Sequence, residues 1–402
     1  MRDRPTVVPR LVPVDSLAMR PYGPSANFDI DVHLTNRCTL RCIHCAPDSG
    51  VMRMSEHDPV RLIDSLERLV RVGATALHLG GGEPFICRDL MFALIEWGGK
   101  NRLQTQVQTN GTLVKDGDID RLFGFGMDQL LLSLDGDRED HDQFRQMKGN
   151  FDTCLSIVDF CTRRGYRMRI NAVASKSTYM SIGQMIQRLE GTTVTTVSIF
   201  NMVPKGRGLA IRNQELSLTE FHAFVQDLED FIQRAGIQSP RVEVQDILKT
   251  REEIAAMGPI RCRIKERTEC LIKSDGSIYP CFLLMDDPIR DPALNSVSLR
   301  RLEPGAEAWD SWRLGNIYEE PADEIWTDPE RWEKYRRLVQ HRRCAGTPHE
   351  VPLCGGGCPA YSYMVGFGKE CDTRCEVDHG ELIPGCFCLR KAIGRNGSTN
   401  GS

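Results

Sequence analysis

Short apolar runs alternate with amphipathic segments between residues 28 and 201. The runs have the length of buried strands, and the segments between them repeat apolar residues at helical spacing. Strands are predicted over residues 28–34, 74–79, 105–109, 129–134, 167–174 and 194–201, and helices over 59–72, 90–97, 118–125, 151–163 and 182–189. Six strand–helix units of this period predict an α/β fold with a parallel sheet and crossover helices.

The flanking segments depart from this pattern and suggest the domain organisation. Residues 1–27, rich in Pro and Arg, are expected to form an N-terminal arm before the main domain at 28–202. Residues 203–260 contain a helical pattern at 216–235 and are expected to be bridging helices. The basic stretch 204–208 is expected to be a solvated loop, in preference to a loop that faces an anionic group of the substrate. Residues 261–390 form a smaller cysteine-rich domain, and 391–402 a disordered tail.

Charge and hydropathy exclude several function classes. The 402 residues carry a net charge of −4, which favours neither nucleic acid nor an anionic membrane surface as a partner. No apolar run approaches the roughly 20 residues that span a bilayer, and the first residues lack the apolar core of a secretory signal. We therefore expect a cytoplasmic protein with no nucleic acid and no membrane partner.

The cysteines gather in two places. Of the 16 cysteines, three lie at Cys38, Cys42 and Cys45, and ten lie between Cys262 and Cys388. In a cytoplasmic chain of this size, such clustering indicates metal sites more than disulfides. A C-x3-C-x2-C loop can hold three corners of a cubane iron–sulfur cluster and leave the fourth iron open to a small molecule.

The stretch Cys38-Thr-Leu-Arg-Cys42-Ile-His-Cys45 resembles the signature of the radical S-adenosylmethionine (radical SAM) enzymes. The resemblance implies a [4Fe-4S] cluster that binds SAM at its open iron and cleaves it. The resulting 5′-deoxyadenosyl radical abstracts hydrogen from a substrate, so the cofactor carries the difficult chemistry. The resemblance also implies a partial (β/α)6 barrel for residues 28–202.

Several polar residues fall at the predicted strand ends, where the sites of parallel α/β folds lie. By the resemblance, the Gly80–Pro84 turn binds the SAM amino group, Ser133 and Arg145 contact the carboxylate and ribose, and His44 lies near the adenine. The candidate cofactor-binding residues are His44, Gly81, Gly82, Glu83, Asn110, Ser133, Asp135 and Arg145. The spacing identifies no catalytic acid or base.

The second group of cysteines resembles the SPASM extension, a C-terminal domain with two auxiliary [4Fe-4S] clusters. The hairpin pattern at 274–281, with Asp-Gly as its turn, is part of that likeness. The resemblance implies Cys262, Cys270, Cys281 and Cys358 as ligands of the first auxiliary cluster. Cys344, Cys354 and Cys375 would bind the second, with Cys371 as a competing or additional ligand.

This chain departs from the SPASM pattern in two places. Thr347 and Pro348 stand where another cluster cysteine is expected, so the second cluster either recruits Cys371, Cys386 or Cys388 or keeps an open iron. A zinc-bound structural domain is the alternative, since zinc also favours dense thiolates. Phe282 replaces the acidic residue of the sulfatase-maturing subgroup, which disfavours that activity.

The sequence therefore predicts a radical SAM/SPASM oxidoreductase whose substrate is a ribosomally made peptide. The peptide would be recognised with or without a separate peptide-recognition protein, and a flavodoxin or ferredoxin would supply electrons. Oxidation or epimerisation of a small molecule, such as an aminocyclitol or sugar in natural-product biosynthesis, is the first alternative. A non-catalytic iron–sulfur electron-transfer protein is the second.

The iron and zinc content of the protein distinguishes an iron–sulfur enzyme from a zinc-bound structural domain. After anaerobic reconstitution we expect about twelve irons per chain if three full cubane clusters form, and about eight if one auxiliary cluster is lost. Reduction in the presence of SAM should release 5′-deoxyadenosine. Zinc in place of iron, without SAM cleavage, would contradict the prediction.

Overall fold

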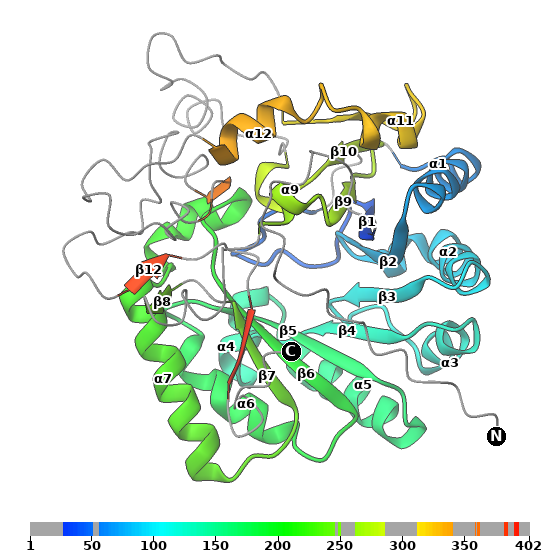
Figure 1. Cartoon of the computed structure of the whole chain (residues 1–402). Coiled ribbons are helices and arrows are strands. Elements are labelled where there is room, and N and C mark those ends of the chain that lie inside the picture. The colour runs from blue at the N-terminus through cyan, green and yellow to red at the C-terminus, as the bar shows by residue number, and fades with distance from the viewer. Residues whose placement is uncertain are drawn as a thin grey trace, which may run out of the picture.

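The computed structural model describes residues 27–50, 56–245, 248–250, 262–285, 312–340, 358, 360–361, 382–384 and 390–393 (Figure 1). The predicted N-terminal arm, apart from residue 27, lies outside the described residues, as do the candidate cluster ligands Cys344, Cys354, Cys371, Cys375, Cys386 and Cys388.

All six predicted strands are present and pair in parallel in chain order. They are β1 (Phe28–Thr35), β2 (Ala74–Gly81), β3 (Gln104–Thr109), β4 (Gln129–Ser133), β5 (Met168–Ala174) and β6 (Val194–Asn201). A seventh strand, β7 (Arg241–Gln245), pairs in parallel with β6 inside the segment that was expected to hold only bridging helices. The result is an open, partial barrel, which confirms the predicted fold class.

Helices cover the outer side of these strands, where α1, α2 and α3 follow one another in Figure 1. The helices that connect the strands are α1 (Pro59–Arg71), α2 (Arg88–Lys100), α3 (Asp116–Gly124), α4 (Arg138–Arg145), α5 (Asn150–Arg164) and α6 (Ile182–Arg188). The sequence pattern did not predict α4. It begins at Asp137, whose carboxylate accepts a hydrogen bond from the backbone N–H of Asp140 at 3.2 Å. The longer α7 (Leu218–Ala235) follows β6.

The two faces of the sheet differ in polarity. On β3, Thr105, Val107 and Thr109 are buried, and Thr105 lies against Gly98 of α2, so this face meets the helices. The alternate residues therefore point to the opposite, concave face. They are Asp29, Asp31 and His33 on β1, His78 on β2, Gln104, Gln106 and Gln108 on β3, Gln129 on β4, and Arg169 and Asn171 on β5. Polar groups thus line the inside of the partial barrel.

The cysteine-rich domain extends this sheet. Its strand β9 (Glu269–Ile272) pairs in parallel with β1, while β10 (Ser277–Tyr279) and β11 (Gly315–Asn316) continue it in antiparallel order. The predicted hairpin is confirmed: Asp275 accepts a hydrogen bond from the N–H of Ser277 at 2.9 Å in the turn between β9 and β10. Trp326 of α11 (Ala322–Thr327) packs against Phe28, with ring centroids 4.9 Å apart. The barrel and the second domain therefore share one sheet and one core.

The remaining elements lie near the chain end. Short helices α9 (Arg263–Glu266) and α12 (Glu333–Gln340) belong to the second domain, and β8 (Leu248–Thr250) pairs with β12 (Leu382–Pro384). Strand β13 (Arg390–Ile393) pairs with β7, so the predicted tail begins inside the sheet, and its remainder lies outside the described residues. Among the helices that the structure describes, none is both long and apolar enough to cross a membrane.

Candidate active site

The cysteine loop follows β1 and folds on its own backbone. The N–H of Cys38 donates to the carbonyl of Gly50 at 3.0 Å, and the N–H of Cys45 donates to the carbonyl of Cys42 at 3.3 Å. Two sulfurs accept backbone hydrogen bonds: Cys38 Sγ from Leu40 at 3.5 Å and Cys45 Sγ from Ser49 at 3.4 Å. Such N–H donors stabilise thiolates over thiols.

The three thiols need a cationic partner to ionise. Burial raises the pKa of Cys38, Cys42 and Cys45, and that of Cys42 reaches about 12 even though the guanidinium of Arg145 lowers it. The bare loop is therefore protonated at neutral pH. Metal binding must drive its deprotonation, as it does at other thiolate sites.

A loop from the far end of the parallel sheet clasps the cysteine loop. Arg207, which follows β6, donates from Nε to the carbonyl of Cys42 at 2.8 Å. Its Nη1 reaches Asp48 Oδ1 at 2.7 Å and the carbonyl of Ser49 at 2.6 Å, and its backbone N–H donates to the carbonyl of Cys45 at 3.0 Å. We call this set of contacts the Arg207 clasp.

The prediction that residues 204–208 form a solvated loop is therefore wrong. Besides Arg207 in the clasp, Lys205 is buried, and its Nζ donates to the carbonyls of Met285 at 2.6 Å and Leu283 at 3.2 Å. Both basic side chains satisfy backbone carbonyls that the cysteine loop and the second domain leave open. No local sequence signal separates such a buried basic loop from an exposed one.

The predicted glycine turn packs tightly on the start of the cysteine loop. The N–H of Gly82 donates to the carbonyl of Thr35 at 2.7 Å, and an added Cβ at Gly82 would lie 2.0 Å from the carbonyl oxygen of Arg37. Gly81 has a φ of +106°, which side-chain-bearing residues rarely adopt. These glycines are needed for close backbone approach.

Glu83 joins the ends of β2 and β3. Its fully buried carboxylate accepts hydrogen bonds from Thr109 Oγ1 at 2.8 Å and from the N–H groups of Asn110 at 2.9 Å and Phe85 at 3.2 Å. Burial raises its pKa, and these donors oppose the rise. Asn110 then donates from Nδ2 to Cys38 Sγ at 3.4 Å, which connects the end of β3 to the cysteine loop.

Asp135 and Arg145 form a buried ion pair at the ends of β4 and α4. Arg145 Nε donates to Asp135 Oδ2 at 2.7 Å, and Asp135 Oδ1 accepts from the N–H of Val173 at 2.9 Å. Burial would raise the pKa of Asp135, but the charge and hydrogen bond of Arg145, together with His44 and His141, hold the pKa below its ordinary value. The two terminal guanidinium nitrogens of Arg145 make no hydrogen bond to a described residue. They remain available to an anion.

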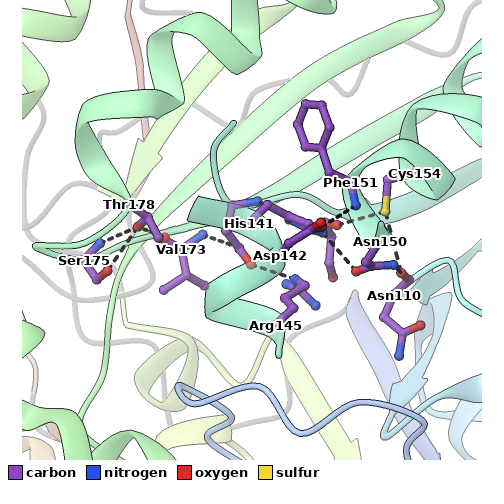
Figure 2. A network of polar contacts seen from close by, with 12 residues as sticks. Asn110, His141, Asp142, Arg145, Asn150, Phe151, Cys154, Val173, Ser175 and Thr178 are labelled. Carbon is purple, nitrogen blue, oxygen red and sulfur yellow. Dashed lines mark hydrogen bonds and ion pairs between the residues drawn. The ribbon is translucent and has the colours of Figure 1, made fainter. Parts of the chain in front are cut away.

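A polar network fixes this pair across three strand ends, as Figure 2 shows. His141 Nδ1 accepts from the N–H of Asp135 at 3.1 Å, so its other ring nitrogen carries the proton and donates to Asn150 Oδ1 at 2.9 Å. Asn150 Nδ2 in turn donates to the carbonyl of Asn110 at 3.2 Å. Burial lowers the pKa of His141 to about 4, so the ring is neutral.

The remaining predicted residues, His44 and Ser133, face the same edge. His44 stacks on Phe144 of α4 with ring centroids 4.0 Å apart and planes 10° apart, and its Nδ1 is buried without a partner among the described residues. Burial lowers its pKa to about 3. Ser133 is buried at the end of β4. The structure thus brings all eight predicted cofactor residues to the edge that holds the cysteine loop.

Four predicted auxiliary ligands are described, and all are buried and free of disulfides: Cys262, Cys270, Cys281 and Cys358. Cys262 precedes α9, Cys270 lies in β9 and Cys281 follows β10. Burial raises the pKa of Cys270. Within the described residues, no three His, Cys, Asp or Glu side chains have the spacing to hold one metal ion. This spacing does not argue against a cubane cluster, because each thiol of such a cluster binds a different iron and the thiols need not converge on one metal ion.

Comparison with known families identifies the site. The model of the radical SAM superfamily matches residues 32–187, which contain the cysteine loop, the glycine turn and the Asp135–Arg145 pair. Residues 32–187 therefore form a radical SAM domain. An iron–sulfur cluster-binding domain of the SPASM type matches residues 262–359. A [4Fe-4S] cluster, SAM and auxiliary clusters are therefore the chain's cofactors, and the three thiols, two of which accept backbone N–H hydrogen bonds, fit the first of these.

Curated relatives of this radical SAM protein align over most of its length. The Fe-coproporphyrin III synthase of Methanosarcina barkeri is 27% identical over 388 residues, covering 90% of this chain and 88% of the relative. The pre-heme d1 synthase of Dinoroseobacter shibae is 25% identical over 350 residues, covering 81% of this chain and 80% of the relative.

Solved structures share the fold. Streptococcus suis SuiB bound to precursor peptide SuiA has a TM-score of 0.67 and 16% identity, covering 87% of this chain and 76% of that one. The anSMEcpe structure with bound AdoMet has a TM-score of 0.60 and 19% identity, covering 83% of this chain and 89% of that one. At these identities the likeness establishes the fold alone.

The Arg207 clasp predicts a cluster-retention defect. In Arg207→Ala, three backbone or carboxylate acceptors of the cysteine loop lose a charged donor, each worth about 1.5–3 kcal/mol. We expect iron bound after reconstitution to fall by at least about half, with unchanged far-UV circular dichroism. Arg212→Ala, in the exposed part of the same segment, should keep wild-type iron content. Full iron retention in Arg207→Ala would contradict this role.

Proposed function

We propose that this enzyme is an oxidoreductase that removes a carbon-bound hydrogen from a ribosomally made peptide. The cluster and SAM, when bound, supply a 5′-deoxyadenosyl radical. The residues at the strand ends orient SAM: Arg145 would hold its carboxylate, Ser133 its ribose, and His44 its adenine. A reduced flavodoxin or ferredoxin would deliver the electron, and the auxiliary clusters of the second domain would accept one from the substrate.

The amide lining of the concave face carries the peptide proposal. Gln106 of β3 registers with Gln129 of β4, and Asn171 of β5 registers with Ser133. Gln104 and Gln108 share the same face of β3. Side-chain amides both donate and accept hydrogen bonds, as peptide groups do. Such a surface suits a polyamide better than an apolar macrocycle.

A tetrapyrrole is the second candidate, favoured by the relatives named as Fe-coproporphyrin III synthase and pre-heme d1 synthase. A tetrapyrrole with carboxylate side chains needs free cations. On the concave face, Arg169 is already engaged, because its Nη2 bonds Glu243 Oε2 and Ser198 Oγ, both at 2.7 Å. This pairing supports the peptide over the tetrapyrrole.

One experiment separates the two candidates. Each short peptide encoded beside the gene is co-expressed with the wild-type enzyme and with the inactive Cys42→Ala variant, and peptide masses are compared. In parallel, reconstituted enzyme is incubated with SAM, reductant and a set of carboxylate-bearing tetrapyrroles, each with and without bound iron, because the relatives are named for their products and not for their substrates. We expect a peptide modified only by the wild-type enzyme, and no change in any tetrapyrrole. Conversion of any of these tetrapyrroles, for example with formation of Fe-coproporphyrin III, and without any peptide product, would overturn the proposal.

Arg145→Lys tests the proposed role of Arg145 toward SAM. A lysine keeps the charge beside Asp135 but loses the planar fork that can hold a carboxylate with two donors. Loss of one charge-assisted hydrogen bond predicts a rise of about 10–100-fold in the KM for SAM, with a smaller change in kcat. Iron content is the control, since Arg145 donates no hydrogen bond to the cysteine loop among the described contacts. An unchanged KM would contradict the assignment.

A further inference from the structure

Two ionisable side chains on the concave face of β1 are left unused by the cofactor site. Asp31 and His33 alternate with the fully buried Ile30, Val32 and Leu34, so they point away from the helices. The carboxylate of Asp31 and the ring of His33 make no hydrogen bond to a described residue. Both are only partly exposed, and a carboxylate shielded from water without a donor is costly. Such a group is expected to meet a ligand.

The direction of Asp31 is fixed by its neighbour on β2. Its partner in the sheet register is His78, yet its Oδ1 lies 4.0 Å from the place that a Cβ on Gly80 would occupy. Gly80 is two residues farther along β2, toward the carboxyl end of the strand. The carboxylate therefore leans toward the edge that holds the cysteine loop.

Gly80 differs from the two glycines that follow it. Added Cβ atoms at Gly81 and Gly82 would collide with backbone at 2.7 Å and 2.0 Å, whereas at Gly80 the nearest described atom is Asp31 Oδ1. Backbone packing thus explains Gly81 and Gly82 but not Gly80. A side chain at residue 80 would instead occupy the space beside the Asp31 carboxylate.

Among the described residues, the charged groups around Asp31 include no cation that is free to pair with its carboxylate. Asp29 lies on the same face of β1 and raises its pKa, while Arg263 of α9 lowers it. Arg263 is itself paired with Glu269 of β9. His78 on β2 is its register neighbour, and His33 is neutral because burial, Lys273 and His57 lower its pKa to about 4. Among these neighbours, the cation Arg263 already pairs with Glu269 and the ring of His33 is uncharged, so neither forms an ion pair with Asp31.

We propose that Asp31, His33 and Gly80 form a substrate subsite that holds an N–H or O–H group of the substrate beside the cysteine loop. Asp31 accepts the hydrogen bond, the neutral His33 ring accepts or donates a second, and Gly80 leaves the room for the group. The inference rests on the proposed function in that the peptide supplies such donors through its amide, amine or hydroxyl groups. The subsite also applies to any other hydrogen-bond-donating substrate.

The first test measures turnover of the peptide identified by co-expression. At saturating SAM, Asp31→Asn and Gly80→Ala should each lower kcat/KM for the peptide by about 10–100-fold, as expected for loss of a buried hydrogen bond to a charged group. Asp29→Asn, one pleat repeat farther from the cysteine loop, and Gly117→Ala, where an added Cβ meets nothing within 4 Å, are the matched controls. Both should stay within about a factor of two of wild type. Wild-type kcat/KM in Asp31→Asn would overturn the subsite.

The second test needs no peptide. Infrared difference spectra of the holoenzyme are recorded across pH, and the Asp31 band is identified as the carboxyl stretch missing from Asp31→Asn. Burial raises the pKa of Asp31 to about 6, so the protonated band should disappear as pH rises through that value. Ethanolamine, a probe with ammonium and hydroxyl donors, should lower the midpoint by about one unit, because a cation favours the ionised form.

The two tests fail independently. An Asp31 midpoint that ethanolamine does not move overturns the subsite, whatever the peptide experiment gives. A midpoint that moves, together with turnover of a tetrapyrrole in place of any peptide, supports the subsite and overturns only the peptide proposal.

Discussion

Parallel pairing of β1 to β7 is the constraint on which the rest of the structure depends. Because consecutive strands pair in the same direction, every loop that leaves a carboxyl end emerges at one edge of the sheet. The cysteine loop, the glycine turn, Asn110 and the Asp135–Arg145 pair are distant in sequence, yet they meet there. Buried polar groups then fix the meeting point. Glu83 joins the ends of β2 and β3, and His141 with Asn150 joins α4 and α5 to β3 and β4.

Much of this arrangement could be predicted from residues alone. Strong apolar periodicity located β1 to β6, and motif spacing located the residues at their ends. Helix α4 could not be found in this way because it is only eight residues long, and seven of them, Arg138 to Gln143 and Arg145, are polar. Its buried face, His141, Phe144 and Arg145, is buried by tertiary contacts that a local pattern does not record. Arg207 was missed for the same reason.

The two faces of the sheet have different roles: one stabilises the fold and the other presents polar groups to a ligand. The helix-covered face of β1 and β3 is apolar or closely packed, and burial there stabilises the sheet. The opposite face carries carboxylates, imidazoles and amides whose burial opposes folding unless something binds them. Asp31 is the clearest example, since its ionised form is disfavoured where it lies. Such positions lower the stability of the folded state, which is typical of sites that bind a ligand.

The Arg207 clasp can form only after the cysteine loop has been synthesised, because Arg207 comes much later in the chain. Arg207 lies 165 residues after Cys42, whose carbonyl it holds. A ribosome that has just produced the cysteine loop has therefore not yet produced the side chain that fastens it. The loop reaches its final form only after the sixth strand has emerged and paired. The clasp therefore closes only late in barrel assembly, when the first and last parts of the barrel are in contact.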